Sequence, residues 1–250
     1  MTPNQLYPLE INPQTQEPFL RLRKHKNIVI TPMRQEDAPN FVPVFNDPRV
    51  YEWLMRTPFP YTLNAAEDGE DWIRENKPGH EAVLKELNEA QGSDTLKIVD
   101  RAPISYIREV QEDGTDIFLG NLSIGRCMHA ELMDTDSIDW EHKAEKDAAN
   151  KKLGVGDPSI VWSFGDYLIP SHHGKGIMTD AIDTLLHEWA IPRMNVRHVL
   201  TGAFIGNHGS VKVFEKNGFV MLRNIEEHSV IRDKMRGMHV LEWRFKEGEV

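Results

Sequence analysis

The chain is poor in cysteine, in positive charge and in long apolar runs, and each shortage excludes a class of protein. Cys127 is its single cysteine, so no disulfide can form within the chain. Lys and Arg number 29 against 39 Asp and Glu, and the formal charge of −10 argues against a nucleic-acid partner, whose phosphates demand a basic surface. No apolar run approaches a membrane span, and the first residues lack a signal-peptide pattern. Together these shortages predict a cytoplasmic protein with neither a nucleic-acid nor a membrane partner.

Metal-binding patterns are also missing. His172, His173, His187, His198 and His208 do not recur with carboxylates at the spacing that metal ligands adopt. We therefore predict no metal site.

What the chain does have is length and apolar content. With 250 residues, of which 40% are hydrophobic, it can form one large domain or two small ones around a substantial core. Residues 1–26 contain four prolines and predict an irregular arm laid over the domain. Residues 129–157 hold eight Asp and Glu against four Lys and Arg, so they form an acidic segment. Its helix is either a solvated surface helix or a lid or partner surface beside the substrate.

Several regular elements can be predicted from periodicity and turn signals. A strand is expected over residues 27–31, followed by helices over 35–45, 49–55 and 67–91. Strand-like runs at 104–110 and 117–127 flank Glu112, Asp113 and Gly114, which predicts a β-hairpin. A charged helix is expected over 137–152, a strand over 198–204, and closing strands over 220–223 and 240–245 with a loop between them.

Residues 160–219 are the stretch around which the rest is organised. A strand rich in β-branched and aromatic residues enters a turn that holds Gly174 and Gly176. An amphipathic helix follows directly, with apolar residues at helical spacing from Ile177 to Trp189. Because the first N–H groups of a helix lack internal partners and lie at its positive end, this arrangement predicts an anion site.

The glycine pattern separates this turn from two common phosphate loops. It is not the P-loop pattern, and Thr179 stands where a dinucleotide-binding loop has its third glycine. The run from His173 to Met178 instead resembles the Gln/Arg-x-x-Gly-x-Gly/Ala loop of the GNAT superfamily of acyl-CoA N-acyltransferases. His173 and Met178 are departures from that loop.

A second block strengthens the resemblance. After the strand at 198–204, the chain is similar to the Asn-x-x-Ser and Lys-x-Gly-Phe block of the same superfamily, through Asn207, Ser210, Lys216 and Gly218. Asn207 is also a good helix N-cap, and Gly218 suits the position after a helix end. The opening of the domain resembles the RimJ/RimL-like branch through residues 30–38 (ITPMRQEDA), 46–50 (NDPRV), 58–63 (PFPYTL) and 71–73 (DWI). The resemblance therefore covers most of residues 27–245.

The resemblance implies an α/β (α+β) GNAT fold over residues 27–250 as a single domain, with the acidic segment at about 129–157 as an insertion. Its central sheet would be mixed, mostly antiparallel and six- to seven-stranded, splayed between strands four and five, with helices on both faces. Acetyl-CoA would be the co-substrate, with its pantetheine lying along the fourth strand and its pyrophosphate on the glycine turn. The cofactor-binding residues implied are Tyr167, Leu168, Ile169, His173, Gly174, Lys175, Gly176, Ile177, Met178, Thr179, Asn207, Ser210 and Phe214.

For catalysis, the resemblance implies direct attack of a primary amine, on a protein N-terminus or a small molecule, at the thioester. Asp166 is the candidate base, and a strand-four N–H near Leu168 or Ile169 would stabilise the oxyanion. Many family members use a tyrosine where this chain has Phe214, so Ser210 is the candidate hydrogen-bond donor to the departing sulfur.

Two other functions stay open at this point. The missing tyrosine permits a CoA-binding or CoA-sensing module without turnover, and the acidic segment permits a non-enzymatic interaction domain. A second copy of the chain is a further candidate partner, because related folds often form homodimers.

Overall fold

A computed structural model describes residues 2–55, 57–62, 69–134, 138–246 and 248. Within these residues, nine strands form one open sheet in the order β1-β2-β3-β4-β5-β6-β7-β9-β8. The strands are β1 (Glu10–Ile11), β2 (Pro18–Arg21), β3 (Ile28–Thr31), β4 (Tyr106–Val110), β5 (Asp116–Arg126), β6 (Val161–Leu168), β7 (His198–Phe204), β8 (Val220–Ile231) and β9 (Lys234–Arg244). Their pairings are antiparallel except that of β6 with β7, which is parallel. The mixed, mostly antiparallel sheet confirms the predicted fold class.

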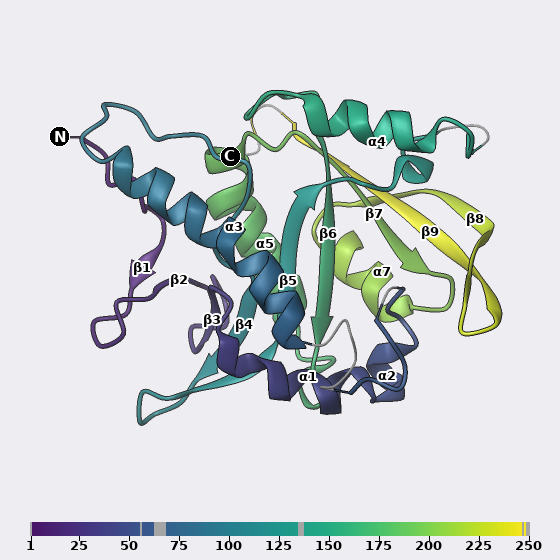
Figure 1. Ribbon diagram of the computed structural model, residues 1–250, viewed down its shortest axis with the longest axis horizontal. Helices are drawn as coiled ribbons and strands as arrows, with labels where there is room; N and C mark the ends of the chain where they lie inside the picture. Colours follow the sequence, from purple (N-terminus) through teal and green to yellow (C-terminus); the bar gives the residue numbers. More distant parts are fainter. Residues whose placement is uncertain (1, 56, 63–68, 135–137, 247, 249–250) are drawn as a thin grey trace.

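Helices cover both faces of this sheet (Figure 1). They are α1 (Ala38–Phe45), α2 (Pro48–Tyr51), α3 (Gly69–Glu89), α4 (Lys143–Lys152), α5 (Ile177–Thr184), α6 (Ile191–Met194) and α7 (His208–Glu215). None of the helices that the structure describes is both long enough and apolar enough to cross a bilayer.

Alternation along β6 divides the core between the two faces. Trp162, Phe164 and Leu168 pack in the largest apolar cluster, together with residues of α5 and α7. Tyr167 points to the opposite face and joins the cluster built around α1, where its ring centroid lies 5.0 Å from that of Phe45. The central strand is thus held from both sides.

The predicted elements are largely present, with shifted ends. The hairpin expected around residues 112–114 is β4–β5, and the helix expected over 67–91 is α3; residues 67 and 68 lie outside the described part. The charged helix expected from residue 137 is α4, which begins at Lys143, and residue 137 also lies outside the described part.

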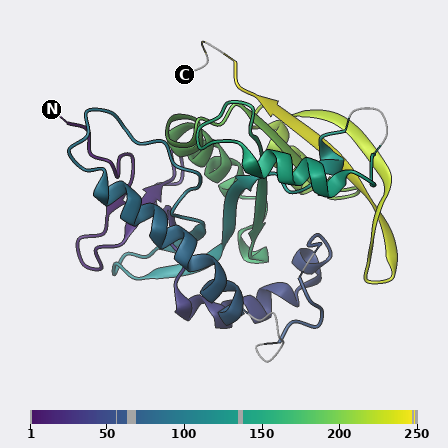
Figure 2. The same ribbon diagram turned by 45° about the horizontal axis from the view of Figure 1, so that its top comes forward.

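Two expectations differ from the structure. The arm was expected to be irregular, but β2 pairs with β3 and β1 with β2, so the arm extends the sheet beyond the six or seven strands expected. The loop expected between 223 and 240 is a long β8–β9 hairpin, whose turn is made by Arg232 and Asp233 at φ +50° and +60°. Charged residues at positive φ are a weak turn signal compared with Asn-Gly, which is why the sequence did not predict this turn. Figure 2 shows the hairpin extending towards the α2 region.

The helix after the glycine turn is also less regular than its periodicity predicts. It begins as α5, continues through a π-helical segment at Leu185–Ala190 and ends as α6. The wider segment lies immediately before Pro192, whose ring cannot accommodate the carbonyl four residues earlier in an α-helix.

Candidate active site

The two central strands β6 and β7 pair only at their beginnings. Their register joins Val161 to His198 and Trp162 to Val199, and no later pair is recorded among the described residues. On its other side, β6 pairs with β5 along almost its whole length, up to Leu168. The sheet therefore opens between β6 and β7, as the resemblance implied.

Backbone groups of β6 face this opening. The Ile169 N–H donates to the Leu119 carbonyl (2.7 Å), which places the backbone groups of alternate positions towards β5. The other positions of β6 consequently direct their N–H groups towards the gap. Asp166 and Leu168 are two of these. Of the two oxyanion donors expected, Leu168 directs its N–H towards the opening, where no described residue accepts it. Ile169 is excluded because its N–H already donates to Leu119 in the sheet.

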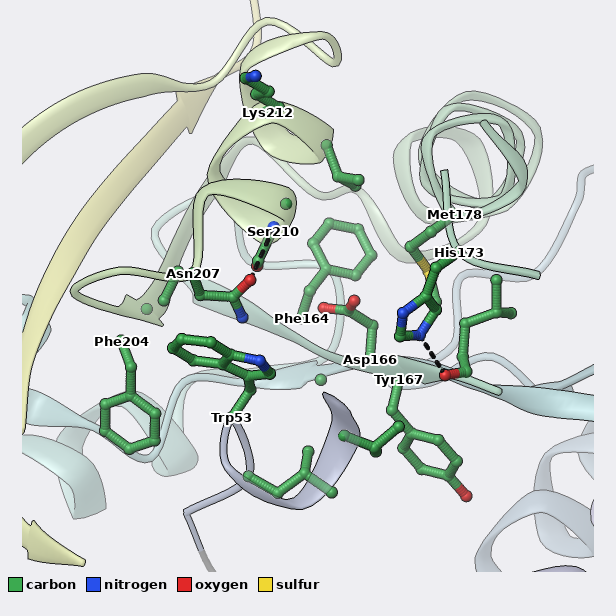
Figure 3. Close-up of a pocket in the computed structure, with 18 of the residues that line it drawn as sticks. Trp53, Phe164, Asp166, Tyr167, His173, Met178, Phe204, Asn207, Ser210 and Lys212 are labelled. Atoms are coloured by element: carbon green, nitrogen blue, oxygen red, sulfur yellow. Dashed lines mark hydrogen bonds between the residues drawn. The ribbon is translucent and has the colours of Figure 1, made fainter. Parts of the chain in front are cut away.

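A cavity of about 600 Å³ occupies the opening. Figure 3 shows the side chains of β6, β7, α5, α7 and the α2 region that converge on it. Its lining comprises Arg49, Val50, Trp53, Leu54, Met55, His129, Leu132, Ser163, Phe164, Gly165, Asp166, Tyr167, Leu168, His172, His173, Gly174, Gly176, Ile177, Met178, Thr179, Gly202, Ala203, Phe204, Asn207, Gly209, Ser210, Lys212, Val213, Lys216 and Met238.

The glycine turn forms one wall of this cavity. Gly174 and Gly176 adopt φ values of +73° and +79°, a region that glycine enters without the strain of a side chain. Gly176 is the N-cap of α5, and its carbonyl accepts the Asp180 N–H at 3.0 Å. The N–H groups of residues 177–179 come before that bond, so they are free of intrahelical partners and available to an anion.

His173 links this turn to the central strand by a hydrogen bond. Its Nε2 lies 2.7 Å from the Leu168 carbonyl, and the ring N–H donates to that oxygen. The departure from the Gln/Arg pattern therefore preserves a hydrogen-bond donor at this position.

Among the described residues that line the cavity, Asp166 alone carries a carboxylate. Its side chain lies near Phe164 and Met178 (Figure 3). Desolvation raises the pKa of Asp166 to about 6. A carboxylate with a pKa in this range is suited to accept a proton near neutral pH.

The second sequence block forms the wall opposite the glycine turn. Asn207 caps α7 by accepting the Ser210 N–H at 3.1 Å, as its residue type predicted, and both residues line the cavity. Phe214 does not. It is 1% exposed, with its ring centroid 5.1 Å from that of Phe219 in the core. Ile169 and Lys175 also lie outside the lining, while the other predicted binding residues lie within it.

Sequence reasoning missed the residues at the remaining wall of the cavity. Trp53, from the segment after α2, and Phe204, from β7, are joined by the Arg236 guanidinium, which lies 5.4 Å from both ring centroids. Arg236 also donates to the Glu52 carbonyl at 2.7 Å. No local pattern marks these residues, because the contacts of Arg236 that bring them together span 32 residues to Phe204 and more than 180 to Glu52 and Trp53.

An open mixed sheet with a glycine turn and a helix start at its gap defines a class of α/β acyltransferase folds. The chain belongs to the GNAT acetyltransferase family, because the acetyltransferase (GNAT) domain matches residues 27–220.

Individual relatives are more distant. The chain is 33% identical to the probable N-acetyltransferase YjcK of Bacillus subtilis over 73 residues, which cover 28% of this chain and 40% of that protein. The RimL ribosomal L7/L12 α-N-protein acetyltransferase has a similar fold, with a TM-score of 0.57 at 10% identity, covering 95% of this chain and 99% of that one. RimJ of Mycobacterium smegmatis, solved with CoA-disulfide, gives a TM-score of 0.53 at 15% identity, covering 94% of this chain and 89% of that one.

Proposed function

We propose that the protein is an acetyl-CoA-dependent N-acetyltransferase that acts on a primary amine, either a protein N-terminus or a small molecule. The observation that carries the proposal is the early end of β6–β7 pairing, which opens a cavity directly beside the start of α5. Family membership and the CoA-bound RimJ relative support the choice of co-substrate.

The residues present fit this co-substrate. Pantetheine contains two amides, and the N–H and carbonyl of Asp166, which face the gap, can pair with them as a further strand would. The N–H groups of residues 177–179 suit the pyrophosphate, with glycines that allow close approach. Lys212 on α7 and Lys216 at its C-cap line the cavity and add positive charge there.

Three groups would carry out the transfer. Asp166 accepts a proton from the amine as the new N–C bond forms and the C–S bond breaks. Leu168 N–H donates to the carbonyl oxygen while it carries negative charge. Ser210 donates a hydrogen bond to the departing thiolate. An α-amine titrates near ~8 and a Lys amine near ~10.4, so a base with a pKa of about 6 suits the α-amine better.

A second function is favoured by one observation. Phe214 is buried in the core at the position where the resemblance expects a tyrosine acid. A protein that binds CoA without turnover would not need that acid.

Two measurements separate these functions. Calorimetry with CoA tests the binding site, and thiol release from acetyl-CoA with a panel of peptides, polyamines and aminoglycosides tests transfer. Amine-dependent thiol release supports the acetyltransferase. CoA binding with no release from any amine supports the binding module, and the absence of CoA binding contradicts both.

A further inference from the structure

The loop between β2 and β3 docks onto the first turns of α5. The Leu22 N–H donates to the Ile28 carbonyl (3.0 Å), which closes the loop. From the tip of this loop, the N–H groups of Lys24 and His25 donate to the Asp180 carboxylate at 3.0 and 2.7 Å. A segment of the N-terminal arm is therefore bonded to the helix whose start forms the anion site.

The His25 ring adds a bridge between the helix and the glycine turn. Its Nδ1 lies 2.7 Å from Asp180 Oδ2, and its Nε2 lies 3.1 Å from the Lys175 carbonyl oxygen. Both partners are acceptors, and a neutral imidazole has a single N–H. The ring therefore bridges the two acceptors, and it donates to at least one of them.

This bridge lies directly behind the anion site. Lys175 stands between Gly174 and Gly176, whose backbone forms the cavity wall. A Cβ added to Gly176 would lie 3.8 Å from His25 Cε1. The ring therefore supports the turn on the side away from the cavity, and it fixes the direction of the Lys175 peptide.

Asp180 explains why such support is needed. It is 1% exposed and belongs to the first turn of α5, so its negative charge lies close to the place where an anionic phosphate would bind. Without partners, this carboxylate would offset the positive end of the helix. Two backbone N–H groups and the His25 ring satisfy it, so the helix start remains favourable for an anion.

We propose that His25 is a positioning residue for the diphosphate of the co-substrate, acting through the Lys175 carbonyl and the Asp180 carboxylate. The inference rests on the proposed CoA-dependent function. It concerns a residue outside the part of the chain that matches the family domain, residues 27–220. The N-terminal arm thereby becomes part of the cofactor site, although it contributes no residue to the cavity lining.

The test compares two acyl donors. Acetyl-CoA carries the diphosphate, and S-acetylpantetheine lacks it. In His25→Ala, kcat/KM for acetyl-CoA should fall about tenfold, as the loss of about 1.4 kcal/mol of binding predicts, and the Kd for CoA from calorimetry should rise by the same factor. The value of kcat/KM for S-acetylpantetheine should stay within twofold of the wild type.

His187→Ala is the matched control. His187 lies in the π-helical segment that continues α5, and its Nδ1 lies 2.9 Å from the Asp183 carbonyl, but it does not line the cavity. It should leave both donors unaffected. If His25→Ala does not fold, His25→Gln, which keeps one donor, should show the same selective loss at a smaller size.

Equal losses for the two donors would overturn the inference, since a general structural role affects both. An unchanged Kd for CoA in the variant would also overturn it. A wild-type protein that binds CoA but transfers nothing contradicts the proposed enzyme while the calorimetric comparison still tests His25. A wild-type protein that does not bind CoA overturns both.

Discussion

At the scale of single residues, Asp166 combines two properties that oppose each other. It lies on the central strand beside apolar side chains, and none of the described residues donates a hydrogen bond to its carboxylate. Burial of an unpaired carboxylate disfavours its charged form, and the same effect makes it a better proton acceptor at neutral pH. Function and stability should therefore respond in opposite directions to its removal.

The first prediction concerns the rate. Asp166→Asn keeps the shape of the side chain but removes the base, so kcat should fall roughly 100-fold, in the usual range for general-base catalysis. Because the carboxylate is the active form, wild-type kcat/KM should rise with pH through about 6, and a second rise near ~8 should follow as the α-amine of the acceptor loses its proton. Thiol release measured from pH 5 to 9 checks both. Asp113→Asn, in the β4–β5 turn outside the cavity, should leave the rate unchanged. A variant with wild-type kcat would rule out Asp166 as the base.

The second prediction concerns stability. An unfolded Asp titrates near ~3.9, and desolvation raises the folded pKa of Asp166 to about 6. The wild type therefore loses stability as pH rises from about 4 to about 6, where the folded carboxyl must ionise. Asp166→Asn should be more stable at pH 8 by about 1–2 kcal/mol, a value discounted for partial solvation. Urea unfolding at pH 8 and pH 4 measures this, and a gain of the same size at both pH values contradicts the linkage.

At the scale of elements, the glycine turn and the N-cap of α7 could be predicted from sequence. Their signals are local, since positive φ favours glycine at positions 174 and 176 and an Asn is a strong N-cap at 207. The role of Phe214 is different. Its place in the family block suggested the cavity, but the direction of a helical side chain depends on which face the helix buries, and α7 buries this one.

The third prediction separates the conformation of the turn from its function. Gly174 and Gly114 both have positive φ, at +73° and +85°, and an added Cβ would meet no atom closer than 3.9 Å at either position. Gly174→Ala and Gly114→Ala should therefore lose similar stability, about 1 kcal/mol each. Only Gly174 lines the cavity, so only its variant should also raise the KM for acetyl-CoA, by roughly fivefold or more. Thermal unfolding and initial rates supply the two readouts. If both variants changed that KM equally, the turn would have no specific role.

At the scale of the whole molecule, the site is built from segments that no local sequence pattern predicts to lie close together. The gap between β6 and β7 could be anticipated through the family resemblance, whereas the residues of the third wall could not. The β8–β9 hairpin reaches the segment after α2, where Arg232 donates to the carbonyls of Leu54 (3.3 Å) and Thr57 (3.1 Å). Such contacts depend on the completed sheet order, in which β9 lies between β7 and β8. Neither residue periodicity nor a short motif contains that information.

This arrangement suggests that different parts of the chain bind the two substrates. The family-like segments, β6, the glycine turn and α7, form the walls that suit acetyl-CoA. The segment after α2, with Trp53, Leu54 and Met55, adds an apolar wall that the hairpin holds in place through Arg236. We expect the acceptor amine to contact this wall, since it lies outside the family motifs, as His129 and Leu132 of the acidic segment also do.

The fourth prediction tests that division. Arg236→Ala removes the hydrogen bond to the Glu52 carbonyl and the cation between Trp53 and Phe204, so this wall should lose its fixed position. With about 1 kcal/mol of cation–π and hydrogen-bond support lost, the KM for the acceptor amine should rise roughly fivefold while the KM for acetyl-CoA stays within twofold. Arg244→Ala is the control, because Arg244 lies on the same strand, pairs with Glu242 at 2.9 Å and does not line the cavity. Two-substrate initial-rate kinetics measure both constants. A rise confined to the KM for acetyl-CoA would place the acceptor at another wall, and the hairpin would then belong to the cofactor side of the site.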